Sequence, residues 1–229
     1  QDMVDASFIQ LTLNTVLLAL SASVLAVLLA LFLAYGKRVY GGKMISTSIR
    51  VVATGYAVPG TVVAVGVMIP FAWFDNSLDS LMRDHFGIST GLLLSGSLFA
   101  VMFAYLVRFL AVSIQSIEAG LSKIKPSMDD AARSLAYRPM AILGRVHLPL
   151  MKGTVLTALL IVFVDVMKEL PATLILRPFN FNTLAVRAFE LASDERLADS
   201  STAALMIVAV GLLPVILLSQ SISTSRAGT

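Results

Sequence analysis

Three charged residues lie close together inside an otherwise apolar stretch of this 229-residue chain. Asp165, Lys168 and Glu169 have the spacing i, i+3 and i+4, so a continuous helix places them on one face, where Lys168 can neutralise either acid. Pro171 removes a backbone donor and should bend the outer part of that helix. Charges in such a stretch are costly unless they face a protein interior or a water-filled cavity. The cluster therefore indicates a polar path, with an ion pair that only fixes helix packing as the alternative.

The composition indicates what surrounds these charges. Hydrophobic residues make up 57% of the chain and charged residues 14%, whereas an average globular chain is about 25% charged. A soluble fold cannot hide that much apolar surface, but a bilayer accepts it on the outside of every helix. The sequence predicts a membrane protein, and most soluble enzymes are excluded. The absence of cysteine excludes disulfide frameworks, thiolate metal sites and cysteine nucleophiles.

Five stretches are long and apolar enough to cross a bilayer, which takes about 20 residues as a helix. They are residues 15–35, 51–74, 92–114, 154–176 and 202–222. The first is a retained span rather than a signal peptide, because Asp2 and Asp5 precede it where a positive region is needed. The expected fold is all-α, with residues 1–229 forming one transmembrane domain of about five spans.

The basic residues assign a side of the membrane to each connection. Lysine and arginine concentrate in cytoplasmic loops, and most of them here fall in residues 36–50, 115–153 and 223–229. The opposite connections are rich in acids. We therefore expect an outside amino terminus, a cytoplasmic carboxyl terminus, and residues 115–153 as the largest cytoplasmic segment.

Other residues in the spans predict how the helices pack. The first span carries a ridge of small side chains where another helix can approach closely; its members are Ala22, Ala26, Ala30 and Ala34. Pro59 and Gly60 in the second span free backbone groups that need neighbouring helices or water, so this span is expected to face the bundle interior. Arg108 lies near the inward end of the third span, where snorkelling to the interface explains it.

The outer segment 177–200 is too polar to cross a membrane but is rich in helix formers. Asn182 or Thr183 can cap a helix there. This segment is expected at the outer mouth, either as a solvated interfacial helix or as a docking surface.

The cytoplasmic segment predicts a short surface helix. Ser127 as N-cap and Asp130 three positions later form a capping box after Pro126, and Pro139 should end the helix. Basic residues surround it. The segment is thus suited to docking a cytoplasmic protein.

A longer pattern in the same segment carries a family resemblance. Asp130-Ala131-Ala132 is followed by three residues, Ala136, nine residues and Val146-His147-Leu148-Pro149. This resembles the EAA loop of ABC importer permeases, which reads Glu-Ala-Ala, three residues, Gly, nine residues, Ile-x-Leu-Pro. Ala136 stands where the family has glycine, which puts in question the need for a glycine-only backbone angle. The resemblance implies a coupling loop over residues 126–149, whose helix enters a groove of an ATP-hydrolysing subunit, and a MetI-like core.

Further stretches resemble the ferric-iron permeases of that family, namely 55–60, 168–173, 177–186 and 190–198. Many of those permeases fuse two halves, and this chain resembles the second. The resemblance implies a bacterial inner-membrane importer of ferric iron. Its partners would be two ATPase subunits, a second permease half and a periplasmic binding protein. Thiamine, sulfate and polyamine permeases share the framework and remain alternatives.

The chain offers no chemistry of its own for hydrolysing nucleotide. Gly42-Lys43 lacks the earlier glycine and the following Ser or Thr of a Walker A loop. We assign no catalytic residue, no cofactor and no nucleic-acid partner, and the sequence leaves metal ligands unknown. A secondary transporter or channel would explain the charges of the fourth span but not the EAA-like loop. The residues expected along a translocation path are Asp165, Lys168, Glu169, Pro171, Pro59 and Gly60.

Overall fold

The computed structural model describes residues 6–226, and every regular element in that range is helical, as the all-α expectation requires. The long helices are α1 (Ala6–Tyr40), α3 (Gly60–Phe86), α4 (Leu98–Ser122), α8 (Lys152–Met167) and α11 (Leu197–Arg226). Shorter elements connect them: α2 (Lys43–Ala53), the 3₁₀ turn η1 (Gly55–Ala57), α5 (Pro126–Ser134), α6 (Pro139–Ile142), the π-helical turn η2 (Leu143–His147), α7 (Leu148–Leu150), α9 (Pro171–Leu176) and α10 (Leu184–Ser193).

Within the described residues, four helices are long and apolar enough to cross a membrane: α1, α3, α4 and α11. The segments 139–150 and 152–167 together make a fifth, bent by 80°. Helices lie at all five expected places, and two of the expected spans are interrupted. Residues 51–74 are interrupted between α2 and α3, and residues 154–176 are interrupted between α8 and α9. The physical reason is a proline at each interruption, Pro59 and Pro171, which cannot continue the backbone hydrogen bonds.

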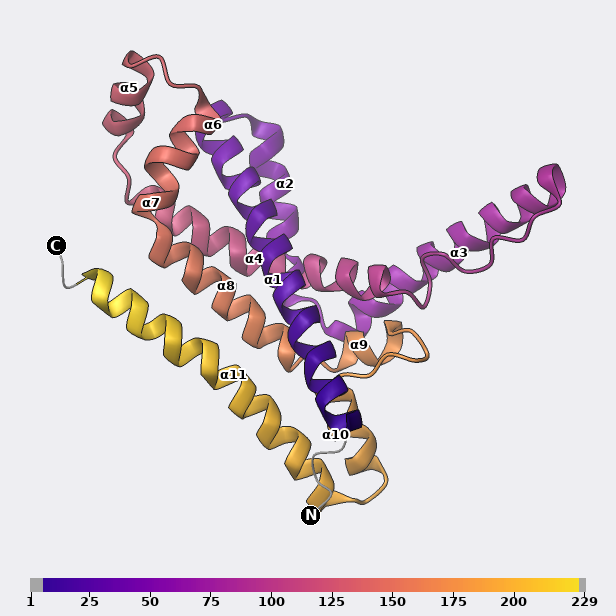
Figure 1. Cartoon of the computed structure of the whole chain (residues 1–229). Helices are drawn as coiled ribbons and strands as arrows, with labels where there is room; N and C mark the ends of the chain where they lie inside the picture. Colours follow the sequence, from indigo (N-terminus) through magenta and orange to yellow (C-terminus); the bar gives the residue numbers. More distant parts are fainter. Residues whose placement is uncertain (1–5, 227–229) are drawn as a thin grey trace.

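Helix α1 is the central element of the bundle and packs against α4 and α8 (Figure 1). Its 35 residues make it about 50 Å long at about 1.5 Å per residue. The small-residue ridge is buried, as expected: Ala22, Ala26, Ala30 and Ala34 are each at most 3% exposed. Small side chains let neighbouring helices approach closely, and packing and hydrogen bonds then hold them together in lipid.

The core consists of two apolar clusters that follow one another along α1. The first, around Tyr105 and Val162, joins α1 to α3, α4, α8 and α9. The second, around Ile114 and Ile117, joins the other half of α1 to α2, α4 and α8. Both clusters contain residues of α1, α4 and α8, so these three helices form the frame on which the remaining elements lie.

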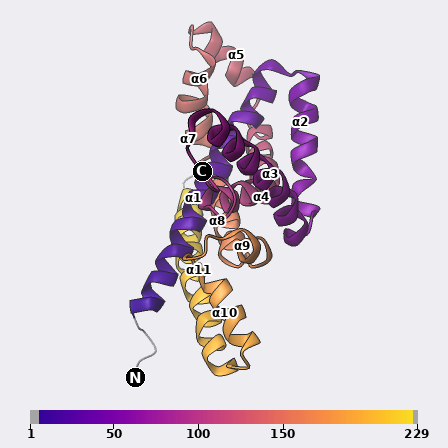
Figure 2. The same cartoon turned by 90° about the vertical axis from the view of Figure 1, so that its right-hand side faces the viewer.

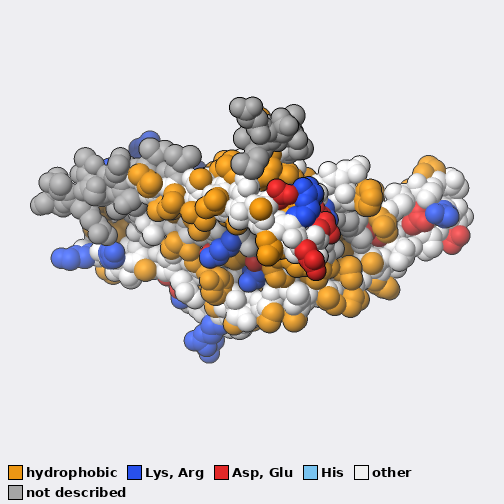
Figure 3. All heavy atoms as spheres, turned by 90° about the horizontal axis from the view of Figure 1, so that it is seen from below, with side chains coloured by type: hydrophobic (Ala, Val, Ile, Leu, Met, Phe, Trp, Pro, Cys, Tyr) orange, Lys and Arg blue, Asp and Glu red, His pale blue; other side chains and the backbone are white. Residues whose placement is uncertain are grey.

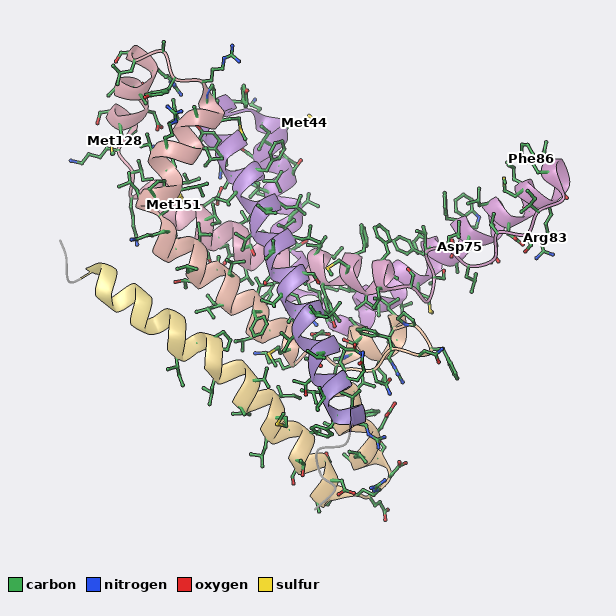
Figure 4. The ribbon with its side chains drawn as sticks, viewed as in Figure 1. Met44, Asp75, Arg83, Phe86, Met128 and Met151 are labelled. Carbon is green, nitrogen blue, oxygen red and sulfur yellow. The ribbon has the colours of Figure 1, made fainter. Side chains whose placement is uncertain are left out.

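The outer half of α3 extends away from the rest of the chain (Figures 1 and 4). We call residues 75–97 the α3 arm; Figure 4 labels Asp75, Arg83 and Phe86 on it. The returning loop is fastened by carboxylates: Asp75 accepts hydrogen bonds from the backbone of Leu94 and Ser95. Within this chain, one stripe of the inner half of α3 packs on the core, and most of the rest of the helix is exposed.

The two ends of the bundle differ in charge. Helices α5 and α6 and the start of α2 lie at one end, and α10 lies at the opposite end (Figure 2). Seen from below, apolar side chains spread over much of the surface, while acidic side chains gather at α10 and at the tip of the α3 arm (Figure 3). The α5 end instead carries many of the basic residues, including Lys43, Lys123, Lys125, Arg133, Arg138 and Arg145.

Candidate functional site

The first helix break separates α2 from α3. Pro59 holds the preceding Val58 in an extended conformation, with φ −79° and ψ 130°, and this ends the helical run before Gly60. Gly55 is pressed against α4, since a Cβ atom there would lie 2.0 Å from the carbonyl oxygen of Val107. Any larger residue at position 55 would have to push the backbone of η1 away from α4.

The second helix break separates α8 from α9. Helix α8 ends at Met167, and Pro171 begins the short helix α9. Proline is tolerated there because the backbone N–H of the first helical position has no partner within the helix. Glu169 lies in this break and is 7% exposed. Its Oε1 accepts a hydrogen bond of 3.2 Å from the backbone N–H of Ala172.

An ion pair joins the two breaks to α4. The Arg108 guanidinium contacts the Glu169 carboxylate, and both side chains are largely buried. Gly60 of the first break lies against this pair: a Cβ atom at position 60 would sit 2.6 Å from Glu169 Oε1 and 2.7 Å from Arg108 Nη1. The absence of a side chain at Gly60 therefore makes room for the pair. Snorkelling as the explanation of Arg108 is wrong, because Arg108 points to a buried carboxylate.

Hydrogen bonds extend from the ion pair along α9. The Thr173 hydroxyl donates to the Glu169 carbonyl oxygen at 2.6 Å, and it also lies 2.5 Å from the buried Tyr105 hydroxyl of α4. Helix α4 thus holds the second break through Arg108 and through Tyr105.

The three charges that share one face of a continuous helix in the sequence do not form one cluster. Lys168 Nζ lies 2.8 Å from Asp165 Oδ1, and its side chain is 64% exposed. Glu169 is paired instead with Arg108. Lys168 thus neutralises Asp165, as expected for one of the two acids, but not Glu169. The helix ends before Lys168, which turns Glu169 toward α4 while Lys168 stays at the surface of α8.

The Arg108–Glu169 ion pair can hold the two interrupted helices together. Interrupted helices expose backbone groups near the middle of a span, which is tolerated only where protein or a water-filled cavity meets them. A buried ion pair is stable in one geometry and costly once one partner is removed. Of the expected path residues, the structure brings Gly60, Glu169 and Pro171 together and leaves Lys168 and Asp165 beside them. Among the described residues, no group of three or more His, Asp or Glu could hold a metal ion.

The loop over residues 126–149 begins with α5. The expected capping box is wrong: the helix starts at Pro126, Lys125 is its N-cap, and no side chain caps it. Proline fits the first helical position because its φ angle is preset and its missing N–H is not needed. Ser127 therefore falls inside the first turn instead of before it.

The end of α5 explains the position where the EAA pattern has glycine. Ala136 has φ 62°, and two hydrogen bonds close the helix: Ala136 N–H to Arg133 O, and Tyr137 N–H to Ala132 O. This is the Schellman arrangement, which needs a left-handed residue and favours glycine. The helix ends at Ser134 for this reason, before Pro139 is reached. The left-handed angle is thus present with alanine in place, at a cost of about 1–2 kcal/mol.

The remaining loop residues differ in exposure. Asp130, Ala131 and Ala136 are exposed, whereas Ala132 is buried within the chain. At the far end of the loop, Leu148 is partly buried and Pro149 is exposed. The open surface of α5 therefore includes Asp130, Ala131 and Met128, with Leu135 exposed directly after the helix. Figure 4 shows Met128 at the same end of the molecule as Met44.

A buried charge network that the sequence reasoning missed lies under α5. Asp129 Oδ2 accepts a hydrogen bond of 2.8 Å from Arg38 Nε, and its Oδ1 lies 2.5 Å from His147 Nε2. Burial alone raises the pKa of the Asp129 carboxyl, but the bonds from Arg38 and His147 outweigh burial and hold the pKa below its usual value. No local pattern reveals the network, because 91 and 18 positions separate these pairs.

At the opposite end, α10 begins where the sequence predicts. The Thr183 side chain caps it by accepting a hydrogen bond from the backbone N–H of Val186. Arg177 Nη2 contacts Glu190 Oε1 at 3.0 Å and fastens the start of the outer segment to α10.

Comparison of sequences finds transport permeases. No profile of a known protein family matches the chain. The chain is 28% identical over 163 residues to an Fe(3+)-transport system permease protein of Haemophilus influenzae, covering 71% of this chain and 29% of that protein. It is 28% identical over 192 residues to a protein of Salmonella typhimurium named as a putative 2-aminoethylphosphonate transport system permease, covering 84% of this chain and 66% of that protein. The chain thus spans less than two thirds of the length of either relative.

Comparison of structures finds the same fold. A bacterial alginate ABC transporter, solved with a periplasmic protein bound to an alginate pentasaccharide, matches with TM-score 0.71 at 16% identity over 93% of this chain and 77% of that chain. The MetNI methionine ABC transporter in an inward-facing conformation matches with TM-score 0.63 at 17% identity over 99% of this chain and 100% of that chain.

The long apolar helices with paired interruptions define a multi-pass membrane protein. With the likenesses above, the chain has the fold of ABC importer permeases and is similar in sequence to bacterial transport permeases. The resemblance based on the EAA-like loop is thereby confirmed at the level of the family and of the fold.

Proposed function

We propose that the chain is the transmembrane permease part of an ATP-driven importer in a bacterial inner membrane. It moves a substrate, delivered by a periplasmic binding protein, into the cytoplasm. The observation that carries this proposal is the loop 126–149, which combines the EAA-like pattern, an exposed helix α5 and a left-handed residue where the pattern has glycine.

The α5 end is assigned to the cytoplasm. Basic residues gather there, and lysine and arginine favour the cytoplasmic side. The amino terminus then lies outside. The exposed surface of α5, including Asp130 and Ala131, together with Ala136 after it, enters the groove of an ATPase subunit. Ala132, on the buried side of α5, and Leu148 and Pro149, at the far end of the loop, set the conformation of the loop.

A second permease half completes the path. The α3 arm and the inner half of α3 leave large apolar side chains uncovered, among them Trp73 at 71% and Ile69 at 62% exposure. Lipid accepts such side chains, but the two helix breaks need protein or water beside them. A second half facing the breaks supplies that environment, and two ATPase subunits then serve the two halves.

The path runs beside the two helix breaks. Lys168 presents a charged group at the surface of α8, paired with Asp165, and Pro59 and Gly60 lie where the first break interrupts the helix. The Arg108–Glu169 pair holds the breaks together in the present arrangement, and separating the breaks would open the path.

Ferric iron is the proposed substrate. The stretches 168–173 and 177–186 resemble ferric-iron permeases, and the Haemophilus relative is named for Fe(3+). 2-Aminoethylphosphonate is the second candidate, because the Salmonella relative matches a larger share of this chain, 84% against 71%.

The test is ATP hydrolysis by the assembled importer in proteoliposomes. Binding protein loaded with Fe³⁺ should stimulate hydrolysis several-fold, and binding protein loaded with 2-aminoethylphosphonate should not; the reverse result selects the second candidate. Ala136→Trp places a bulky side chain where close approach is required, a clash of about 1–3 kcal/mol, so ATPase co-purification should fall. Ala198→Trp, at an exposed outer position, is the matched control. Unaltered co-purification with Ala136→Trp would remove this loop as the ATPase contact.

A further inference from the structure

Adjacent acids on α5 have opposite environments. The Asp130 side chain is 72% exposed, whereas that of Asp129 is 11% exposed. Asp130 belongs to the EAA-like pattern and faces outward. Asp129 faces the bundle, and both of its carboxylate oxygens are engaged by basic side chains from other elements.

One of these side chains, Arg38, ties the inner end of α1 to three places. Its Nε donates to Asp129 Oδ2 at 2.8 Å, its Nη1 donates to Leu121 O at 2.5 Å, and its Nη2 donates to Ile124 O at 2.8 Å. The Leu121 carbonyl lies in the last turn of α4, where a cation is favoured by the helix dipole, and the Ile124 carbonyl lies just after the helix. The fixed fork of the guanidinium therefore sets the end of α1, the end of α4 and the start of α5 at one relative position.

The other basic side chain, His147, ties α5 to the turn that leads into the fourth span. His147 is fully buried, and its Nε2 lies 2.5 Å from Asp129 Oδ1. An ionised carboxylate only accepts hydrogen bonds, so Nε2 carries the proton. The His147 ring also packs edge-on against Tyr35 of α1, with ring centroids 5.3 Å apart, and the Tyr35 hydroxyl donates to Pro139 O at 2.7 Å.

We propose that Asp129 is a positioning residue that transmits movement of α5 to the membrane helices. Its carboxylate is the single group of α5 that is bonded both to Arg38 at the end of α1 and to His147 in η2 among the described contacts. A displacement of α5 must carry α1 and η2 with it or break two charge-assisted bonds at once, and such bonds are the stronger kind. This inference rests on the proposed function, in which the ATPase moves α5.

A second ion pair on the same helices provides a matched control. Lys37 Nζ lies 2.7 Å from Glu118 Oε1, and this pair links α1 to α4 without involving α5. Glu118→Gln removes a charge near Arg38 but leaves the α5 connection in place. Asp129→Asn removes the charge that holds α5 and keeps the side-chain size.

The experiment uses the complete permease–ATPase complex and a single reporter cysteine in this cysteine-free chain. Tyr56→Cys is the reporter, because Tyr56 lies in η1 at the first helix break and is 49% exposed. The labelling rate by a water-soluble maleimide is measured with and without ATP plus vanadate, and ATPase co-purification is measured in parallel. The reporter chain and its Glu118→Gln version should change labelling rate at least threefold with nucleotide. The Asp129→Asn version should retain the ATPase and lose this change.

The outcomes separate the inference from the proposed function. An Asp129→Asn chain that retains the ATPase and responds like the reporter chain overturns the inference and leaves the importer assignment intact. A reporter chain that binds no ATPase overturns both. If Asp129→Asn does not elute as a folded protein, the same labelling is measured in His147→Gln, which keeps a donor near the Nε2 position, and in His147→Leu, which does not. The glutamine variant should respond to nucleotide and the leucine variant should not; equal responses overturn the inference.

Discussion

The Arg108 guanidinium contacts the Glu169 carboxylate at the point where two helix breaks meet, although 61 positions separate these residues in the sequence. Gly60 packs directly against the pair. One buried interaction thereby fixes α4, the start of α3 and the start of α9 relative to one another.

Removing one partner of this pair should destabilise the protein more than removing both. Glu169→Gln or Arg108→Met leaves an uncompensated buried charge, which costs about 3–5 kcal/mol. The double variant should recover much of that loss, because the glutamine that replaces Glu169 still accepts from the Ala172 N–H and no charge is stranded. Thermal unfolding in detergent measures the stability, and uptake in proteoliposomes measures transport. Additive losses in the double variant would show that the two side chains act independently, and full recovery of uptake would reduce the pair to a packing role.

Gly60→Ala should separate the same pair from within the first break. The added Cβ would lie 2.6 Å from Glu169 Oε1 and 3.3 Å from Pro171 Cβ, and overpacking of this kind costs about 1–3 kcal/mol. Gly66→Ala on the same helix is the control, since a Cβ there meets no atom within 4 Å, and alanine in a helix interior gains about 0.5–1 kcal/mol over glycine. Melting temperatures should therefore shift in opposite directions. An unchanged melting temperature in Gly60→Ala would mean that the Arg108–Glu169 pair can accommodate the added Cβ atom.

Ala136→Gly should stabilise the loop after α5. The φ angle of 62° is strained for alanine and free for glycine, so relief of about 1 kcal/mol is expected after the larger entropy of the unfolded glycine is subtracted. Ala131→Gly, at an exposed position inside α5, should cost about 0.5–1 kcal/mol. Resistance of the loop to limited proteolysis reports both changes. Equal losses in the two variants would contradict the left-handed assignment at position 136.

The charged contacts of the Asp129 carboxylate predict that the packing of α5 loses stability in acid. Arg38 from α1 and His147 from η2 face the carboxylate, Arg133 lies on the same helix, and the folded pKa is below the ordinary 3.8. The charged form is thus favoured by folding, so its contribution is complete at pH values above the unfolded pKa and is lost as pH falls through the folded pKa. Protection of α5 in hydrogen exchange should be constant from neutral pH to about pH 5 and decline below about pH 4. Asp129→Asn should lack this decline; an identical acid profile in the variant would assign the decline to other groups.

The orientation can be tested with two exposed positions. Asp84→Cys at the tip of the α3 arm should react with an impermeant thiol reagent added to intact cells, and Lys125→Cys at the start of α5 should react only after permeabilisation. Asp84 suits the purpose better than Asp79, because the Asp79 carboxylate holds the arm through bonds from Thr90 and Gly91. The opposite labelling pattern would reverse the sides assigned from the basic residues.

Features set by short-range rules can be predicted from the sequence. The buried alanine ridge follows from a four-residue period, the Thr183 cap follows from residue type before an apolar run, and the two prolines mark the helix breaks. The loop 126–149 follows from the spacing of its pattern. The first residue of α5 cannot be predicted in this way, because Ser127 and Pro126 both favour helix initiation and the proline takes the first helical position.

Features made by distant residues cannot be predicted in the same way. Asp165, Lys168 and Glu169 suggest one cluster only while the helix is assumed to continue, and the break at Met167 sends Glu169 to Arg108 instead. Asp129 and Asp130 look alike in the sequence, yet tertiary packing buries one and exposes the other. Partners 61 and 91 positions apart leave no periodic signal.

The most direct test of the importer assignment is cross-linking from α5 to the ATPase. Leu135→Cys and Leu197→Cys introduce single cysteines at leucines of similar exposure, 72% after α5 and 70% at the outer start of α11. With a bifunctional thiol reagent and the co-expressed ATPase subunit, Leu135→Cys should give a permease–ATPase adduct whose yield changes with ATP, and Leu197→Cys should give none. An adduct from Leu197→Cys, or its absence from Leu135→Cys in a complex that still contains the ATPase, would contradict the assignment of this loop as the contact through which ATP drives import.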